Sequence, residues 1–157
     1  MEGEAPSRKA LDEVCKPMIR QWCMAMQEGS PLDIDEEYAK NSRYGSVIAP
    51  PTMLLTWPMP PLGPPGNDPS HPFEKFLEKL DQAGYLGTIV TNVNKKYYRP
   101  LFPGDKVTYS YKVTDVSPEK QTGLGKGFFV TAGFDFKNQK GETVGTQRCA
   151  VLKYGIG

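Results

Sequence analysis

Two carboxylates near the N-terminus are the side chains best suited to acid–base chemistry. Glu28 and Asp33 lie five residues apart, between two helix-forming segments. Paired carboxylates whose pKa values differ can divide the work, because one holds a proton while the other orients water. The same residues suit a structural role, with Glu28 at a helix end and Asp33 as a local cap. The sequence leaves both interpretations open.

His71 is the only histidine, and therefore the only side chain whose ordinary pKa lies near neutral pH. It stands between Ser70 and Pro72 in a stretch dense in proline. An exposed neighbour of a helix cap is the expected role there, so we do not assign His71 as a catalytic base.

Basic residues with the chemistry to hold phosphate groups form a small set: Arg43, Lys95, Lys96 and Arg99. Arginine offers a planar fork of donors, and lysine a mobile point charge. Basic residues outside a motif more often form a solvated surface, and that alternative stays open. The neighbouring Tyr97 and Tyr98 are expected in the core or at an interface.

Length, charge and cysteine content exclude several classes of function. The 157 residues suit one domain, 1–157, and Lys and Arg total 19 against 18 for Asp and Glu. No excess charge is present to hold a nucleic acid or an anionic membrane. The odd number and wide spacing of the cysteines favour reduced, buried thiols over disulfides or a zinc site: Cys15, Cys23 and Cys149. Without a signal-peptide pattern or a membrane-spanning stretch, we expect a soluble protein of the cytoplasm.

Two helices are expected near the N-terminus. Apolar residues at three- and four-residue spacing predict a helix over 16–29, with Pro17 in its first turn and Gly29 as its stop. Asp35 can cap a second helix, because its carboxylate satisfies free N–H groups at the helix start. That helix should end near Asn41.

Proline shapes the middle of the chain. Pro51 precedes an apolar segment, 52–57, that we interpret as the candidate central helix. Residues 58–72 contain seven prolines, too many for a helix or a paired strand, which predicts a surface loop. A helix with one apolar face follows and is closed by Gly84. The loop and this extra helix form a predicted insertion over 58–84.

The second half of the chain is expected to form an antiparallel sheet. Apolar residues alternate with polar ones over 107–113 and 128–136, which indicates two long strands. Residues 138–141 have the chemistry of a hairpin turn and lead into a last strand over 143–153. An earlier strand is expected within 84–98. Helices followed by a meander predict an α+β domain, in which a curled antiparallel sheet wraps around an early helix.

Several short motifs together carry a family resemblance. They are Glu28-Gly-Ser-Pro31-Leu-Asp33-Ile-Asp35, Tyr38-Ala39, Arg43-Tyr44-Gly45, Ile48-Ala49-Pro50-Pro51, Tyr97-Tyr-Arg-Pro100-Leu-Phe-Pro-Gly104-Asp105 and Gly141-Glu-Thr-Val. This set resembles the MaoC-like hydratases, in particular the N-terminal half of two-part dehydratases, over residues 17–154. The resemblance implies a hot-dog fold that binds an acyl-CoA thioester. Such domains add water across a trans-2,3 double bond, or remove it, without a metal or cofactor.

The same resemblance locates the positions at which this chain departs from the family. The family signature reads Asp-x-Asn-Pro-x-His-x-Asp, and its first Asp and its His act together on water and on the substrate α-carbon. The Asp falls on Glu28 and the His on Asp33. A backbone donor for the thioester carbonyl falls on Pro51, which has no N–H. By this resemblance no catalytic residue is intact.

The resemblance also implies a division of labour. Two-part hydratases of this group, including those that act on bulky steroid side-chain CoA esters, pair a hot-dog domain carrying the dyad with one that lacks it. We therefore expect a catalytic MaoC-like partner subunit, while the 58–84 insertion widens the acyl tunnel. The substrate-binding candidates in this chain are Arg43, Tyr44, Gly45, Ala49, Thr52 and Arg99.

Other interpretations stay open. The chain can serve as an acyl-CoA-binding scaffold without a hydratase partner, or as a self-sufficient homodimeric hydratase or thioesterase that uses its carboxylates. Hot-dog domains usually pair so that their sheets become continuous, so self-association or hetero-oligomerisation is expected. In similar proteins a zinc-ribbon and OB-fold domain follows, and a longer native chain with a further C-terminal domain is expected.

Overall fold

Short helices in the first half and long strands in the second make up the computed structural model, which describes residues 7–59 and 72–156. The helices are α1 (Lys16–Met26), α2 (Pro31–Ile34), α3 (Glu36–Asn41) and α4 (Pro72–Gln82), with one 3-10 helix, η1 (Pro51–Leu55). The strands are β1 (Ser7–Lys9), β2 (Gly87–Tyr97), β3 (Thr108–Val116), β4 (Lys120–Thr122), β5 (Gly125–Lys137) and β6 (Thr143–Tyr154). The predicted α+β class is confirmed.

The six strands form one antiparallel sheet in the order β1-β3-β5-β6-β2, and β4 pairs with the start of β5. The predicted hairpin between β5 and β6 is present, since Asn138 N donates to Glu142 O at 3.0 Å and Gly141 has a φ of +76°. β1 and β4 were not predicted, because three residues are too few for an alternating pattern to show. Among the strands of residues 7–59 and 72–156, β2 pairs only with β6 and lies at an edge.

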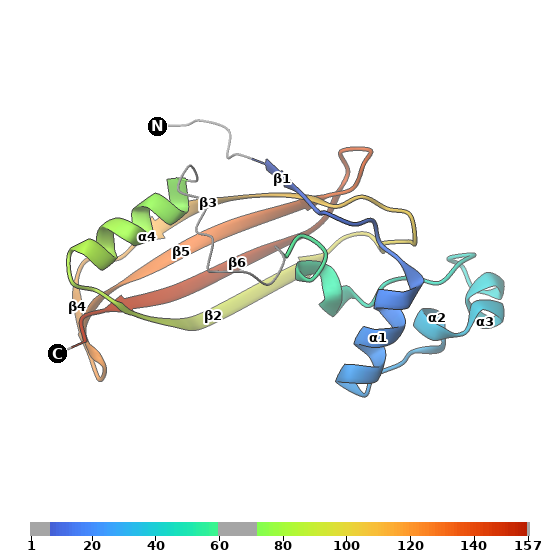
Figure 1. Ribbon diagram of the computed structural model, residues 1–157, viewed down its shortest axis with the longest axis horizontal. Coiled ribbons are helices and arrows are strands. Elements are labelled where there is room, and N and C mark those ends of the chain that lie inside the picture. Colours follow the sequence, from blue (N-terminus) through green and yellow to red (C-terminus); the bar gives the residue numbers. More distant parts are fainter. Residues whose placement is uncertain (1–6, 60–71, 157) are drawn as a thin grey trace.

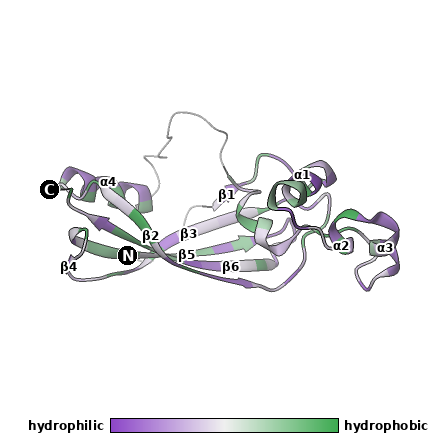
Figure 2. Cartoon of the chain, turned by 90° about the horizontal axis from the view of Figure 1, so that it is seen from below, coloured by the Kyte–Doolittle hydropathy of each residue, from purple (hydrophilic) through white to green (hydrophobic). Residues whose placement is uncertain are grey.

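The helices pack on one face of this sheet, which we call the inner face. Tyr109, Tyr111, Phe134 and Phe136 stack on that face with ring centroids 5.2–6.4 Å apart. Ile19 of α1 and residues of η1 join the aromatic rings in the main apolar core. Figures 1 and 2 show α1, α2 and α3 at one end of the sheet and α4 at the other.

The first two predicted helices are present, with one corrected boundary. α1 ends at Met26 and not at Gly29, because Gln27 takes a left-handed φ of 52° and the Glu28 N–H bonds Cys23 O at 2.9 Å. A non-glycine residue thus closes the helix. Asp35 caps α3 as predicted, since its Oδ1 accepts from Tyr38 N at 2.9 Å.

The candidate central helix is a short 3-10 helix. η1 covers five residues and begins at Pro51, so the proline start was predicted correctly. It packs near one end of the sheet: a Cβ added to Gly145 of β6 would lie 2.6 Å from Leu54 Cδ2. Trp57 and Pro58 follow in a turn, and so few residues cannot extend along the length of the strands.

α4 confirms the predicted helix after the proline-rich stretch. Tyr85 N bonds Leu80 O at 2.9 Å, and Gly84 has a φ of +95°, so this glycine closes the helix as expected. The Phe73 ring meets Tyr111 edge-on at 5.6 Å, which places the apolar face of α4 against the sheet. Residues 60–71, including His71, lie outside the described residues. The extent of the 58–84 insertion therefore stays a prediction.

The cysteines are free thiols, as expected, but only Cys23 is buried. Cys15 and Cys149 are half-buried, because each lies at the margin of the core and not inside it. In the part of the chain that the structure describes, no helix is long and apolar enough to span a bilayer. Within the same residues, no cluster of His, Cys, Asp or Glu side chains could hold a metal ion.

Candidate substrate-binding site

A cavity of about 210 Å³ lies between η1 and the end of β2, and we call it the Pro51 cavity. Four of the predicted site residues line it: Tyr44, Ala49, Pro51 and Arg99. The remaining lining residues are Ile48, Pro50, Leu54, Tyr97, Tyr98, Pro100, Leu101 and Val144. The two motifs that start at Ile48 and at Tyr97, far apart in sequence, therefore both form walls of one cavity.

Backbone hydrogen bonds hold these walls together. Ala49 N donates to Leu101 O at 2.8 Å and forms an isolated β-bridge between the two segments. Tyr98 N donates to Val144 O at 2.9 Å, which fixes the second wall to β6. Because main-chain bonds position the walls, the cavity is built on the rigid frame of the sheet.

The basic and aromatic residues at this end take different positions. The Arg43 guanidinium lies 4.7 Å from the centre of the Tyr44 ring and donates to its hydroxyl, but Arg43 itself does not line the cavity. Gly45 and Thr52 also lie outside the lining. Arg99 does line it, and its Nη1 lies 3.4 Å from Glu142 Oε1. Arg99 is thus the basic residue among the described lining residues of the cavity.

Glu28 and Asp33 lie near one another but outside the Pro51 cavity. Burial raises the pKa of the Asp33 carboxyl above its ordinary value, a hydrogen bond with the Ser30 backbone opposes this, and the Glu28 charge raises it further. The local cap of α2 is Ser30, whose Oγ accepts from Leu32 N at 3.3 Å. Asp33 lies in the first turn of α2, and its hydrogen bond with the Ser30 backbone is consistent with the expected local capping role.

The segment containing Pro51 is connected to α2 by one bond, from Ile48 N to Leu32 O at 3.2 Å. Pro51 is the first residue of η1 and has no N–H to offer a carbonyl oxygen. The next bond of η1 runs from Met53 N to Pro50 O at 2.9 Å, so that donor is already used. The start of η1 can contact a substrate but lacks the expected donor at Pro51.

The cavity suits binding better than proton transfer. Its polar groups are the phenols of Tyr44 and Tyr97 and the Arg99 guanidinium. Tyr98 also lines it, but its hydroxyl lies 3.5 Å from Thr146 Oγ1 on the other face of the sheet, and the remaining lining residues are apolar. Burial raises the pKa of the Tyr97 hydroxyl, so this group stays neutral at physiological pH. Such a wall can accept an acyl or pantetheine chain and donate hydrogen bonds to it.

A match to the family described as the FAS1-like, dehydratase domain region extends over residues 5–147. The chain belongs to this family. The FAS1-like dehydratase region is the MaoC N-terminal type that the motifs from Glu28 to Pro51 indicated, so the predicted family is confirmed.

Two relatives of this dehydratase region are hydratase subunits. The probable enoyl-CoA hydratase alpha subunit of Thermomonospora curvata is 34% identical over 149 residues, which are 94% of this chain and 47% of that protein. The 3-oxo-4,17-pregnadiene-20-carboxyl-CoA hydratase alpha subunit of Mycobacterium tuberculosis is 38% identical over 130 residues, 82% of this chain and 41% of that protein. The chain spans less than half the length of these relatives.

The fold also matches a solved structure. A chain in the crystal structure of the ChsH1-ChsH2 complex from Mycobacterium tuberculosis superposes with a TM-score of 0.87 and 31% identity, covering 97% of this chain and 84% of that chain. The predicted hot-dog fold is confirmed by this likeness.

Sequence reasoning missed two residues of the Pro51 cavity. Tyr97 and Tyr98 were expected in the core or at an interface, but they are 42% and 57% exposed and line the cavity. The core interpretation was wrong because both lie where the edge strand β2 ends. The run of two tyrosines before Arg99 and Pro100 was the available signal, since exposed aromatic residues beside a turn often bind ligands.

Proposed function

We propose that this chain is the substrate-shaping subunit of a hetero-oligomeric MaoC-like enoyl-CoA hydratase. One observation supports the proposal: Tyr44, Ala49 and Arg99 line the Pro51 cavity. By the sequence resemblance, Glu28, Asp33 and Pro51 fall at the positions of the family's reacting groups. In this proposal the cavity holds part of the acyl-CoA thioester, and a partner hot-dog domain supplies the catalytic Asp and His. The alpha-subunit names of the two relatives support it.

The open edge of the sheet supports the need for a partner. β2 is 11 residues long and hydrogen-bonds only to β6 among the described strands. A long unpaired edge exposes main-chain donors and acceptors that a second strand can satisfy. Pairing along β2 would place the partner's strands beside Tyr97, and hence beside the Pro51 cavity.

An exposed apolar patch on the inner face, which no described helix covers, supports a bulky substrate. η1 reaches only one end of the sheet, and Val90 and Val93 of β2 remain 57% and 47% exposed. Their register partners on β6 are Val151 and Cys149, so this apolar patch lies on the same face as the core. We infer that a bulky ring system, of the steroid type named for the Mycobacterium tuberculosis relative, occupies this space.

The test is reconstitution with a hot-dog subunit that carries an intact Asp and His. Hydration is followed as loss of enoyl-thioester absorbance, for the chain alone, the partner alone and the complex. We expect the complex to exceed the chain alone by at least ~100-fold, because in this proposal the partner supplies the general base. Turnover by the chain alone at the rate of the complex would contradict the proposal.

Variants of the complex then locate the binding wall. Tyr97→Ala should raise KM about tenfold with a smaller effect on kcat, because it removes contacts that the substrate makes before and during reaction. Lys126→Ala, an exposed change on β5 away from the cavity, is the matched control and should leave KM unchanged. Equal KM values for the two variants would show that the cavity does not bind substrate.

A second candidate function has one observation in its favour. The raised pKa of Asp33 next to the Glu28 charge is what a reworked carboxylate pair would need. In that case Asp33→Asn in the isolated chain would abolish hydration of enoyl-CoA or hydrolysis of saturated acyl-CoA. Unchanged activity of the complex with this substitution would exclude the carboxylate pair.

Binding of acyl-CoA without turnover in any assembly would instead indicate a scaffold.

A further inference from the structure

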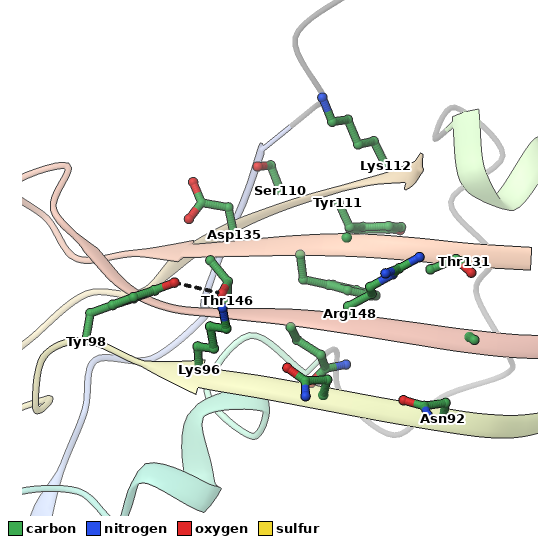
Figure 3. Close-up of a pocket in the computed structure, with 15 residues that line it drawn as sticks. Asn92, Lys96, Tyr98, Ser110, Tyr111, Lys112, Thr131, Asp135, Thr146 and Arg148 are labelled. Atoms are coloured by element: carbon green, nitrogen blue, oxygen red, sulfur yellow. Dashed lines mark hydrogen bonds between the residues drawn. The ribbon is translucent and has the colours of Figure 1, made fainter. Parts of the chain in front are cut away.

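The face of the sheet opposite the helices carries a hollow of about 1000 Å³. Strand register places its side chains on this outer face: Asn94, Arg148, Gly133 and Lys112 form one row across β2, β6, β5 and β3. Lys96, Thr146, Asp135 and Ser110 form the next row on the same face. We call the space above these two rows and the neighbouring residues Asn92, Ala150, Thr131 and Tyr98 the outer hollow (Figure 3).

Small side chains explain why this face is hollowed. Gly133 lies between Arg148 and Lys112 in its row and has no side chain, and the floor beside it includes the Thr114 methyl group, which lies 3.1 Å from where a Cβ on Gly133 would be. Ala150, two residues beyond Arg148 on the same face of β6, keeps the floor low on the next row. The long side chains of Arg148 and Lys112 thus stand on either side of a depression, with their backbones about 10 Å apart, or two strand spacings.

The charges around the outer hollow are unbalanced. Lys96, Lys112 and Arg148 line it, and none forms an ion pair with a residue that the structure describes. Asp135 is the only carboxylate among the described lining residues, and its Oδ2 lies 3.6 Å from Lys137 Nζ. Figure 3 shows the three cationic side chains coming from three different strands. A dianionic ligand would meet these cations without displacing an internal salt bridge.

The neutral groups add donors suited to phosphate oxygens. Ser110, Thr131 and Thr146 contribute hydroxyls, and Asn92 and Asn94 contribute amides. Tyr98 stands at one end of the hollow, where its hydroxyl lies 3.5 Å from Thr146 Oγ1. An arginine fork, lysines and hydroxyls around one concavity is the donor set that proteins use for phosphoryl groups.

We propose that the outer hollow binds a diphosphate-bearing small molecule, held by Arg148 and Lys112 across Gly133 and by Lys96. The diphosphate can belong to a free nucleotide or to the nucleotide end of a coenzyme A ester. The site lies on the opposite face of the sheet from the inner-face core and does not depend on hydratase activity. Failure of the proposed function would therefore not contradict the proposal that the outer hollow binds a diphosphate.

The test is a calorimetric titration of the chain with pyrophosphate, ADP, coenzyme A and adenosine. Pyrophosphate and ADP should bind saturably with one ligand per chain and weaken as salt increases, because the contacts are ionic. Adenosine should not bind. Tighter binding of coenzyme A than of ADP assigns the site to the coenzyme when Arg148→Gln weakens both, because coenzyme A held only in the Pro51 cavity would not respond to that substitution. The reverse order of affinities assigns the site to a free nucleotide. Either result supports the proposal.

Charge-removing variants locate the site. Arg148→Gln and Lys112→Gln should each weaken ADP binding at least tenfold, whereas Lys126→Gln, an exposed lysine outside the hollow, should not. Thermal melting of each variant checks that the fold is kept. Absence of saturable binding by wild-type chain, or equal affinity in all three variants, would overturn the proposal. So would binding of a glutamate-rich peptide together with failure of every phosphate compound.

Discussion

At the residue scale, Asp33, which aligns with a position of the catalytic signature, has a carboxyl group whose pKa is raised by its surroundings. Asp33 is half-buried in α2, and its pKa is raised by burial and by the Glu28 charge. The pKa of the Cys23 thiol is also raised, by burial and by the charges of Asp33 and Glu28. The three groups thus lie close enough for their charges to interact, although Cys23 is buried, Asp33 is half-buried and Glu28 is exposed.

The Asp33 environment predicts a pH-dependent gain from Asp33→Asn. Because folding raises the pKa of Asp33, the folded chain binds a proton more tightly than the unfolded chain. Stability is therefore lost as pH rises from the ordinary pKa near 4 through the raised value. At pH 7 the asparagine variant should be more stable by about 0.5 kcal/mol or less, since solvent screens this half-exposed group.

Thermal unfolding between pH 4 and pH 7 measures this gain. The difference between Asp33→Asn and wild type should shrink towards pH 4, where both side chains are uncharged for most of the time. Asp35→Asn is the control, because asparagine caps a helix as well as aspartate does. A gain that is the same at every pH would mean that the ionisation of Asp33 does not cause it.

At the element scale, α4 is joined to the end of the sheet by a buried charge. The Lys153 side chain is 4% exposed, and its Nζ donates to Asp81 of α4 and to Thr88 Oγ1, the latter at 2.8 Å. At the other end of α4, Glu74 Oε1 accepts from the Tyr111 hydroxyl at 2.7 Å and lies 3.2 Å from Arg8. Polar contacts thus fix both ends of a helix that the amphipathic pattern alone would only orient.

Removing one member of the Lys153 pair should be costly. Asp81→Asn leaves a buried ammonium without its counter-charge and should lower the free energy of unfolding by about 1–3 kcal/mol. Adding Lys153→Met should recover part of the loss, because it removes the unpaired charge and keeps the volume. Urea unfolding of the single and double variants measures both effects.

An exposed ion pair provides the matched control for that series. Lys16 Nζ and Glu36 Oε1 lie 2.8 Å apart at the surface, so Lys16→Gln should cost no more than ~0.5 kcal/mol. If Lys16→Gln and Asp81→Asn lower the free energy of unfolding equally, burial does not strengthen the contribution of the Lys153–Asp81 pair to stability. A double variant less stable than Asp81→Asn alone would show the same.

At the scale of the whole molecule, the free edge of β2 and the uncovered patch beside it are the features that a complete assembly must account for. Val90 and Val93 add apolar surface where the main chain is also unpaired. β1 occupies the opposite edge of the sheet but is only three residues long. β2 is thus the edge with the length and the apolar surface to pair stably.

Val93→Lys should therefore weaken the complex with the hydratase partner. A lysine on an edge strand opposes strand pairing. Its charge would also lie, without a counter-charge, on the apolar patch that the substrate covers in the proposed function. We expect at least a tenfold rise in the dissociation constant, measured by light scattering after size exclusion or by titration. The isolated variant should melt close to wild type, since Val93 is 47% exposed before assembly.

Val116→Lys is the matched change away from this edge. Val116 is 38% exposed on β3, which is paired on β5 and lies far from β2 in the strand order. This variant should assemble normally. If it dissociates as readily as Val93→Lys, or if neither dissociates, the partner does not bind along β2.

The sequence by itself determined the local elements and the family. The cap at Asp35, the stop at Gly84 and the turn at 138–141 were predictable, because each depends on residues a few positions apart. Alternation along 128–136 likewise identified the inner face of β5. The gap-free motif from Glu28 to Pro51 pointed to the dehydratase family for the same reason.

Only the tertiary structure decided which of the motif residues meet. It placed Tyr44 and Arg99 in the lining of one cavity, left Arg43 outside that cavity and put Tyr97 at the end of the edge strand β2. It also put Lys153 in a buried pair, although its neighbours in sequence give no sign of this. These outcomes depend on strand order and on register between segments up to 72 residues apart, which local propensities do not encode.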